Sequence, residues 1–189
     1  MYAGPLPVKH VLVTGGNTGI GFALCRQLAA DHSCHVYLGA RFGGHGHSAD
    51  SIPSLLLSSS SRIRTFISPS SSPSSRLTRN LTTRSIPKGE KAVTEILKRH
   101  PGVKLELVQI DVSSDESVKA AAAKLKAKGV PLYGVVNNAG AGLSHPGVTV
   151  ADVLNVNLNG VKRMCAAFLP LLDHWTGRFV NVGSGAGPM

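Results

Sequence analysis

A glycine-rich turn stands between an apolar run and a helical pattern in "VTGGNTGIG", residues 13–21. The apolar, β-branched residues before it are typical of a strand buried on both faces. Gly15, Gly19 and Gly21 lack Cβ atoms, so the backbone can approach a phosphate closely, and the following helix presents free N–H groups to it. The spacing is TGxxxGxG and not GxGxxG, but the strand–turn–helix context is that of a dinucleotide site. The segment predicts a pyrophosphate-binding turn, with an ordinary glycine-rich turn as the alternative.

Short apolar runs and helical periodicities continue to alternate along the chain. The expected strands are "HVLVTG" (10–15), "HVYLGA" (35–40), "KLELVQID" (104–111), "LYGVVNNAG" (132–140) and "GRFVNV" (177–182). Helices are expected between them, the last being one long helix over residues 150–172. This alternation predicts an α/β fold, a Rossmann-type doubly wound parallel sheet of about five strands that is incomplete at its C-terminal side.

Length and composition restrict the class of protein. A chain of 189 residues with an apolar fraction of 42% fits one globular domain. No apolar run approaches the roughly eighteen residues of a membrane span, and the N-terminus lacks the features of a secretory signal. The three cysteines share no motif spacing, which is typical of reduced thiols and not of a metal site. We therefore expect a cytoplasmic protein with no membrane partner and no metal.

Residues 42–87 interrupt the alternation with fourteen serines and four prolines. They show no periodicity and few residues to bury, so we expect disorder there. Strand-to-helix links in such folds usually have about two to six residues. We interpret the segment as a translated non-coding insertion or an unselected loop, with a regulatory or RNA-binding loop as the alternative. The expected organisation is a first βαβ part at 1–41, the insert at 42–87, and the truncated remainder of the domain at 88–189.

The formal net charge of +10 raises the question of nucleic acid binding. Residues 42–87 contain five arginines and one acidic residue, and the rest of the excess is scattered over helices. Bases usually stack on aromatic side chains, and the insert offers only Phe42 and Phe66 for this purpose. We therefore do not expect a nucleic acid partner.

Four motifs outside the insert resemble the short-chain dehydrogenase/reductase family. They are "TGGNTGIG" at 14–21, "NNAG" at 137–140, "NVNLNG" at 155–160 and "GRFVNVGS" at 177–184, in the order and spacing of that family. The first motif, a strand ending in Ala-Arg, and "FLPLL" before the fifth strand are similar to the carbonyl-reductase branch in particular. The resemblance covers residues 8–41 and 88–189. It implies an oxidoreductase that reduces a small-molecule carbonyl, namely an aldehyde, a ketone or a quinone.

The resemblance also implies a role for each matching position. The positions that would contact the dinucleotide are Gly15, Asn17, Gly19, Ile20, Gly21, Asp111, Val112, Asn137, Ala139 and Gly140. The first five would line the phosphates, the next two would contact the adenine, and the last three would pass beside the ribose. Asn157 would hold a proton-relay water, and Ser184 would orient the substrate carbonyl.

The residue that ends the second strand predicts which cofactor is bound. NAD-selective folds place Asp or Glu there to bind the 2′-hydroxyl of the adenosine ribose. This chain has Arg41, whose planar fork of donors suits a 2′-phosphate. The sequence therefore favours NADP(H), with an ordinary surface arginine as the alternative.

Hydride transfer to a carbonyl also needs a proton donor beside the developing alkoxide. The resemblance implies a tyrosine followed four residues later by a lysine. The three tyrosines are Tyr2, Tyr37 and Tyr133, and none has a lysine at that spacing. We expect this pair, and two further strands, to lie beyond Met189, so that the chain alone is inactive. The fifth strand would then be an exposed apolar edge that favours self-association.

Three functions follow from these observations. The first is an NADPH-dependent carbonyl reductase, represented here by its nucleotide-binding part. The second is a non-catalytic dinucleotide-binding or interaction module. The third, and least favoured, is an RNA-associated protein that acts through the basic insert.

Overall fold

The computed structural model describes residues 8–41, 88–143 and 147–184. All of these residues belong to one compact unit of the chain. The predicted disorder of residues 42–87 lies outside the described residues and stays a prediction, and so do the proposed domain boundaries.

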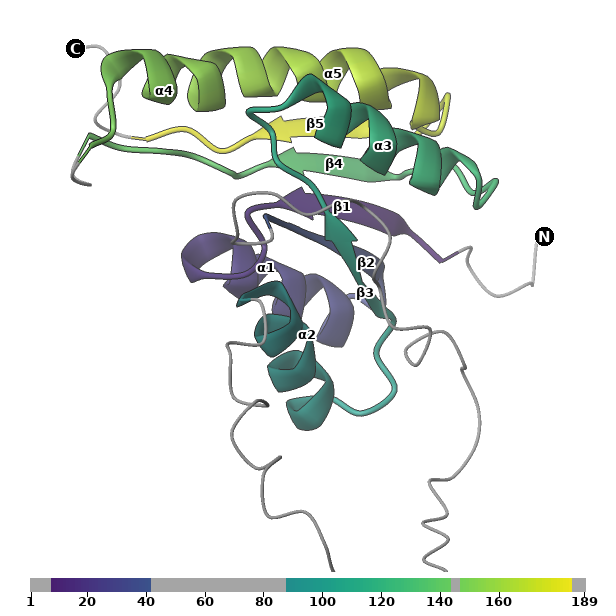
Figure 1. Cartoon of the computed structure of the whole chain (residues 1–189). Helices are drawn as coiled ribbons and strands as arrows, with labels where there is room; N and C mark the ends of the chain where they lie inside the picture. The colour runs from purple at the N-terminus through teal and green to yellow at the C-terminus, as the bar shows by residue number, and fades with distance from the viewer. Residues whose placement is uncertain (1–7, 42–87, 144–146, 185–189) are drawn as a thin grey trace, which may run out of the picture. The chain divides into compact units, whose positions relative to one another are not determined.

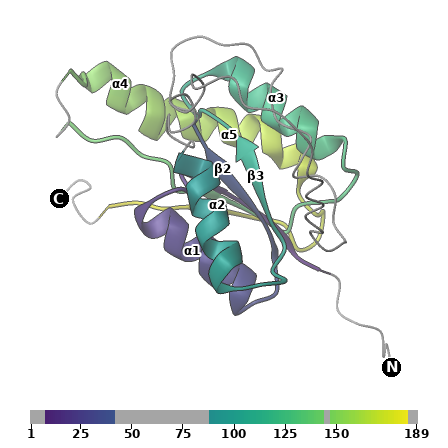
Figure 2. The ribbon, with the colours of Figure 1, turned by 60° about the horizontal axis from the view of Figure 1, so that its bottom comes forward.

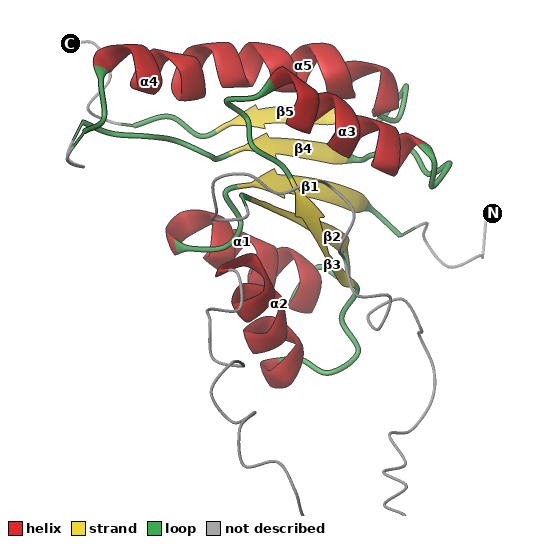
Figure 3. Cartoon of the chain, in the orientation of Figure 1, coloured by secondary structure: helices red, strands yellow, loops and turns green. Residues whose placement is uncertain are grey.

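Five parallel strands form one sheet in the order β3-β2-β1-β4-β5 (Figure 3). The strands are β1 (His10–Thr14), β2 (His35–Ala40), β3 (Leu105–Gln109), β4 (Gly134–Asn137) and β5 (Arg178–Asn181). The chain moves outward from β1 to β3 and then crosses back to place β4 and β5 on the other side of β1. This reversal is the switch point of a doubly wound sheet. The predicted Rossmann-type α/β fold is confirmed.

Helices cover both faces of the sheet (Figures 1 and 2). One face carries α1 (Gly19–Ala30) and α2 (Lys88–Arg99), and the other carries α3 (Asp115–Lys126) and the helical run that begins with α4 (Val150–Leu154). None of the helices in the described part of the chain has the length and apolarity needed to cross a bilayer.

Alternating strand residues divide the core into two layers, as the pleat of a strand requires. The layer under α1 and α2 contains Val11, Val13, Val36, Leu38 and Val136. The layer under α3 and α5 (Val161–Phe168) contains Leu12, Tyr37, Val108, Val135 and Phe168. The central strands are buried on both faces, which explains why their sequences are apolar throughout.

The long helix predicted over residues 150–172 is present as an unbroken helical run over residues 150–171, but its turns are not all α-helical. A π-helix, η2 (Asn155–Gly160), separates α4 from α5, and the run ends in a 3-10 helix, η3 (Leu169–Leu171). A Cβ added at Gly160 would lie 3.1 Å from the carbonyl oxygen of Val112, so the helix packs on that backbone closely. Arg163 Nη1 donates to the carbonyl oxygens of Val112 and Asn155 at 3.3 and 3.2 Å. These long-range contacts favour the wider turn, and periodicity does not reveal them.

Strand β5 lies at one side of the described sheet. Val180 in β5 is 48% exposed, and Val182, just after the strand, is 41% exposed. The prediction of an exposed apolar edge is therefore confirmed for the described residues, whereas self-association stays a prediction.

Three rings stack where β1 and β2 begin. The ring centroids of His10 and His35 are 4.8 Å apart, and those of His35 and Tyr37 are also 4.8 Å apart. The Nδ1 atom of His10 is 3.1 Å from the Tyr37 hydroxyl. Burial, followed by the charges of Lys104 and Lys128, lowers the pKa of His10. Burial, followed by the charge of His10, lowers the pKa of His35, with Glu106 acting in the opposite direction.

Because both pKa values are lowered in the folded state, the unfolded chain takes up more protons just below about pH 6.5. The free energy of unfolding is therefore expected to fall as the pH is lowered through this value, and to level off once both rings are charged in the folded state. Urea denaturation between pH 5.5 and 7.5 measures this. His35→Gln should flatten the dependence relative to the parent chain. An equal slope in His35→Gln and the parent chain would contradict the explanation.

Candidate functional site

All five strands end at one edge of the sheet, which we call the carboxyl edge. A predicted site residue follows each of these ends: Gly15 after β1, Arg41 after β2, Asp111 after β3, Gly140 after β4 and Ser184 after β5. Ligands of open α/β sheets bind in the crevice at this edge. The topology therefore brings the predicted motifs to one side of the molecule.

The turn after β1 needs glycine for two separate reasons. Gly15 and Gly19 have φ values of +64° and +55°, which side chains rarely adopt. A Cβ at Gly21 would lie 2.4 Å from both the Gly15 carbonyl oxygen and Asn138 Nδ2. A Cβ at Gly19 would meet no protein atom within 4 Å, so this position faces open space. Within the same turn, the side chain of Asn17 is half-buried and Ile20 is 70% exposed.

The Thr14 hydroxyl joins the turn to the segment after β4. It donates to the Val136 carbonyl oxygen at 3.2 Å and accepts from the N–H groups of Asn138 and Ala139, both at 3.0 Å. Asn138 Nδ2 donates to the carbonyl oxygens of Thr14 and Gly15 at 3.0 and 3.3 Å. The residues predicted from the sequence include the neighbours of Thr14 and Asn138 but not these two. Both could have been selected from the sequence, because Thr14 lies in the motif at 14–21 and Asn138 in the motif at 137–140.

The predicted ribose neighbour Asn137 is buried and connects β4 with β5. Its Nδ2 donates to Asn181 Oδ1 at 2.8 Å, and the two residues are register partners. Its Oδ1 is buried and has no hydrogen-bond partner among the described residues. The structure thus gives Asn137 a bracing contact between strands, as well as its place beside the carboxyl edge.

The predicted adenine contact Asp111 shapes the turn that leads into α3. Its Oδ1 accepts from the backbone N–H and the hydroxyl of Ser113 at 2.9 and 2.7 Å. Its own N–H donates to Ser117 Oγ at 2.8 Å. The adjacent Val112 is buried and packs against Gly160. One carboxylate oxygen of Asp111 therefore has a structural function already.

The predicted proton-relay residue Asn157 lies in the π-helix and contacts the segment after β4. Its Oδ1 accepts from Ala141 N at 2.8 Å, and its Nδ2 donates to Ala141 O at 2.9 Å. An amide side chain has two acceptor sites and two donor hydrogens, so one of each remains for a water. The paired bonds fix the course of the chain just beyond Gly140.

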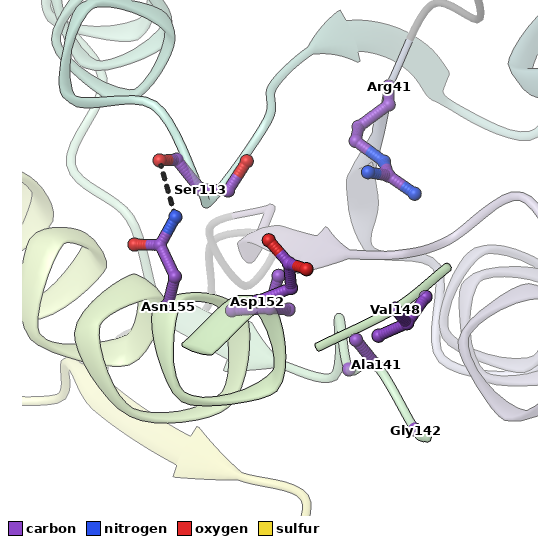
Figure 4. Close-up of a pocket in the computed structure, with 9 residues that line it drawn as sticks. Arg41, Ser113, Ala141, Gly142, Val148, Asp152 and Asn155 are labelled. Atoms are coloured by element: carbon purple, nitrogen blue, oxygen red, sulfur yellow. Dashed lines mark hydrogen bonds between the residues drawn. The ribbon is translucent and has the colours of Figure 1, made fainter. Parts of the chain in front are cut away.

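A pocket of about 370 Å³ opens between these segments (Figure 4). Its volume is within the range of roughly 300–1,000 Å³ that is usual for small-ligand sites. The residues that line it are Arg41, Ser113, Gly140, Ala141, Gly142, Val148, Asp152, Asn155 and Val156. The pocket joins the end of β2, the turn after β3, the segment after β4 and the start of the helical run.

Two charged side chains of opposite sign line this pocket, Arg41 and Asp152. Asp152 Oδ2 accepts from the hydroxyl and the backbone N–H of Thr149 at 2.6 and 2.9 Å. These two bonds, the hydroxyl first, lower the pKa of Asp152, so it is ionised near neutral pH. The spacing Thr-x-x-Asp is typical of the start of a helix. Nothing in the sequence indicates that this cap also faces a pocket.

The two described tyrosines lie away from the carboxyl edge. Tyr37 is buried in β2 and contacts His10, at the opposite end of β1. Tyr133 precedes β4, and Lys9 Nζ stands 4.5 Å from the centre of its ring. In the part of the chain that the structure describes, no tyrosine therefore stands near Ser184, which is exposed three residues after β5.

A family model for short chain dehydrogenases matches residues 77–189. The chain belongs to the short-chain dehydrogenase/reductase family. The short chain dehydrogenase anuI of Penicillium roqueforti is 30% identical to it over 94% of this chain and 56% of its own. A 3beta-hydroxysteroid dehydrogenase of Caenorhabditis elegans, dhs-16, is 41% identical over 48% of this chain and 26% of its own. The chain spans at most about half the length of these curated relatives.

Solved structures of this family share the fold. An alcohol dehydrogenase of the archaeon Thermococcus sibiricus, solved in complex with 5-hydroxy-NADP, superposes with a TM-score of 0.60 at 25% identity, over 93% of this chain and 57% of the other. A short-chain dehydrogenase/reductase mutant of Serratia marcescens gives a TM-score of 0.61 at 19% identity, over 96% of this chain and 58% of the other. At 19% identity, the similarity to the Serratia marcescens structure supports the fold alone.

Removing the Thr14 hydroxyl tests the brace between β1 and β4. Thr14→Val keeps the shape of the side chain but leaves the part-buried N–H of Ala139 without its acceptor, whereas the N–H of Asn138 still donates to the Val136 carbonyl oxygen at 3.1 Å. We expect a loss of about 1–2 kcal/mol in the free energy of unfolding, measured by urea denaturation. Thr18→Val is the matched control, because the Thr18 side chain makes no capping hydrogen bond. Equal losses in both variants would show that the hydroxyl network does not carry the stability.

Proposed function

We propose that this chain carries the nucleotide-binding part of an NADPH-dependent reductase that acts on small-molecule carbonyls. The observation that carries the proposal is the position of Arg41 in the wall of the pocket at the carboxyl edge. Membership of the short-chain dehydrogenase/reductase family supports hydride-transfer chemistry. The complex of the Thermococcus sibiricus alcohol dehydrogenase with 5-hydroxy-NADP supports the choice of cofactor.

The charge of Arg41 suits the extra phosphate of NADPH. Strand β2 ends at the buried Ala40, and Arg41 follows it as an exposed residue. Sheets that select NAD place a carboxylate here, which would repel a 2′-phosphate. A guanidinium donates two parallel hydrogen bonds to a phosphate and stays charged at any physiological pH.

The turn after β1 fits the pyrophosphate. The backbone at Gly19 faces open space, and α1 begins at this residue. The N-cap residue Thr18 makes no side-chain capping bond, so the first N–H groups of α1 remain available to an anion. The partial positive charge at the start of the helix adds to this attraction.

The remaining predicted roles concern the carbonyl. When bound, the cofactor supplies hydride from C4 of its nicotinamide. We assign Ser184 to orienting the substrate carbonyl, because it follows β5 at the carboxyl edge. We assign Asn157 to holding the segment after β4, with its unused donor and acceptor available to a water.

Replacing Arg41 tests the cofactor preference. Arg41→Gln removes the charge that would pair with the 2′-phosphate, so affinity for NADPH is expected to fall about 10-fold or more while affinity for NADH is unchanged. Titration of the chain with each nucleotide, followed by fluorescence or calorimetry, measures this difference. Arg99→Gln, on the surface of α2, is the control and should bind both nucleotides like the parent chain. Stronger binding of NADH than NADPH by the parent chain would refute the role of Arg41.

A second candidate function is dinucleotide binding without hydride transfer. The observation that favours it is the position of Tyr37 and Tyr133, neither of which stands at the carboxyl edge. General acid catalysis requires a donor within hydrogen-bond reach of the reacting oxygen.

A turnover assay distinguishes the two candidates. The purified chain, once shown to bind NADPH, is expected to oxidise it no faster than a buffer control in the presence of a model aldehyde, ketone or quinone. Absorbance of the reduced nicotinamide measures the rate. Clear turnover that Ser184→Ala abolishes would show that another residue donates the proton, and would favour the reductase over the binding module.

A further inference from the structure

Three loops meet at the edge of the sheet opposite the pocket, where the strands begin. Leu132 N donates to Leu171 O, and Asp173 N donates to Leu132 O, both at 2.8 Å. Tyr133 N donates to His10 O, also at 2.8 Å. These bonds place the segments that precede β1, β4 and β5 side by side. We call the surface formed by Val8, Lys9, Lys128, Val130, Leu169 and Trp175 the amino rim.

Apolar side chains are exposed on this rim. Trp175 is 84% exposed and Leu169 is 62% exposed, while Val8 and Val130 are 40% and 39% exposed. Single exposed apolar residues are ordinary on a protein surface. Here a tryptophan and three aliphatic side chains occur on adjoining loops, and this grouping is typical of a binding surface.

A tight turn holds Trp175 in its exposed position. Asp173 Oδ1 accepts from the backbone N–H groups of Trp175 and Thr176 and from the Thr176 hydroxyl, at 3.1, 2.7 and 2.7 Å. A Cβ added at Gly177 would lie 2.5 Å from the Asp173 carbonyl oxygen, so the turn closes tightly. The edge of the Trp175 ring packs against His174, with centroids 4.8 Å apart. A backbone already fixed by this turn lowers the entropy lost when Trp175 binds.

Lysines lie along the same edge of the sheet. Lys9, Lys104 and Lys126 are exposed near this edge, and Lys128 pairs with Glu106 at 3.0 Å. Hydrogen bonds from Thr176 lower the pKa of Asp173, so its carboxylate places one negative charge beside Trp175. The four lysines of this edge outnumber these two carboxylates.

We propose that the amino rim binds the surface of a membrane that contains anionic phospholipid. Tryptophan and aliphatic residues partition into the boundary between headgroups and acyl chains, and lysines are attracted to the negative surface. Aliphatic side chains form neither hydrogen bonds nor ion pairs with nucleic acid phosphates. The composition of the amino rim therefore favours a lipid surface over RNA. Such an association needs no membrane-spanning helix. It replaces the expectation of no membrane partner, which rested on the lack of an apolar span and of a secretory signal. It leaves the carboxyl edge with its pocket turned away from the bilayer.

The single tryptophan of the chain makes a direct test feasible, because Trp175 is the only indole that emits. The chain is mixed with vesicles of phosphatidylcholine alone, or of phosphatidylcholine with phosphatidylserine. We expect a blue shift of the emission and sedimentation with the phosphatidylserine vesicles only, both weakened by added salt.

Substitutions test whether the amino rim is the part of the chain that binds the vesicles. Sedimentation with vesicles measures the binding of each variant. Trp175→Ala and Lys9→Gln should each weaken binding to anionic vesicles, the lysine variant by about fivefold. Leu143→Ala is the matched control, because Leu143 is 61% exposed but follows β4 at the carboxyl edge. All variants keep residues 42–87, so the arginines there do not account for a difference between them. Circular dichroism confirms that each variant is folded.

Three outcomes would overturn the proposal. One is equal binding to both kinds of vesicle, or to neither. Another is binding to anionic vesicles that Trp175→Ala leaves unchanged. The third is a shift of Trp175 emission on addition of single-stranded RNA but not of vesicles, which would identify the rim as a nucleic acid surface.

Discussion

The Thr14 hydroxyl lies where the two halves of the sheet meet, and the geometry of the carboxyl edge depends on it. It bonds three backbone groups on the β4 side, while Asn138 returns two bonds to the backbone at Thr14 and Gly15. The glycine turn thereby has one fixed position relative to the segment after β4. Because a rearrangement would break all five of these hydrogen bonds together, the arrangement resists local opening. The turn that would bind the phosphates is rigid before any ligand arrives.

Local patterns predicted the strands, the glycine turn and the parallel fold, because period and glycine content depend on neighbouring residues only. Contacts across the sheet were not predictable in the same way. Thr14 and Asn138 are 124 residues apart, and their bonds exist only because β4 lies next to β1. The π-helical turns of the last helical run have the same origin, since Arg163 donates to Val112 in the turn after β3. The capping box of Thr149 and Asp152 was readable from the sequence, but its place in the Arg41 pocket depends on the folded arrangement.

The two edges of the sheet differ in charge for a reason that lies in the helices. Acidic residues occupy the first turns of α2, α3 and α4, which lie near the carboxyl edge, and lysines or arginines occupy the last turns of α2 and α3. Each charge complements the helix dipole at its end. Since α2 and α3 run opposite to the strands, their basic last turns add positive charge to the amino edge, whereas α1, α4 and α5 have no basic residue in their last turns. Helix α1 also has no acidic residue in its first turn. That end of α1 therefore remains suited to an anion.

The nucleotide half of the site is held more firmly than the half that would orient a carbonyl. Strands β1 and β2 are buried on both faces, whereas three of the four residues in β5 are exposed. The bond from Asn137 to Asn181 and the partly buried Phe179 attach β5 to the rest of the sheet. Local opening is easiest where few apolar contacts must be broken, so β5 is expected to open before β1 or β4. Ser184 follows β5 and would move with it, while Gly15, Arg41 and the pocket would keep their positions. Nucleotide binding is therefore the function that this part of the chain supports most directly, and positioning of the carbonyl depends on whatever stabilises the outer edge of β5.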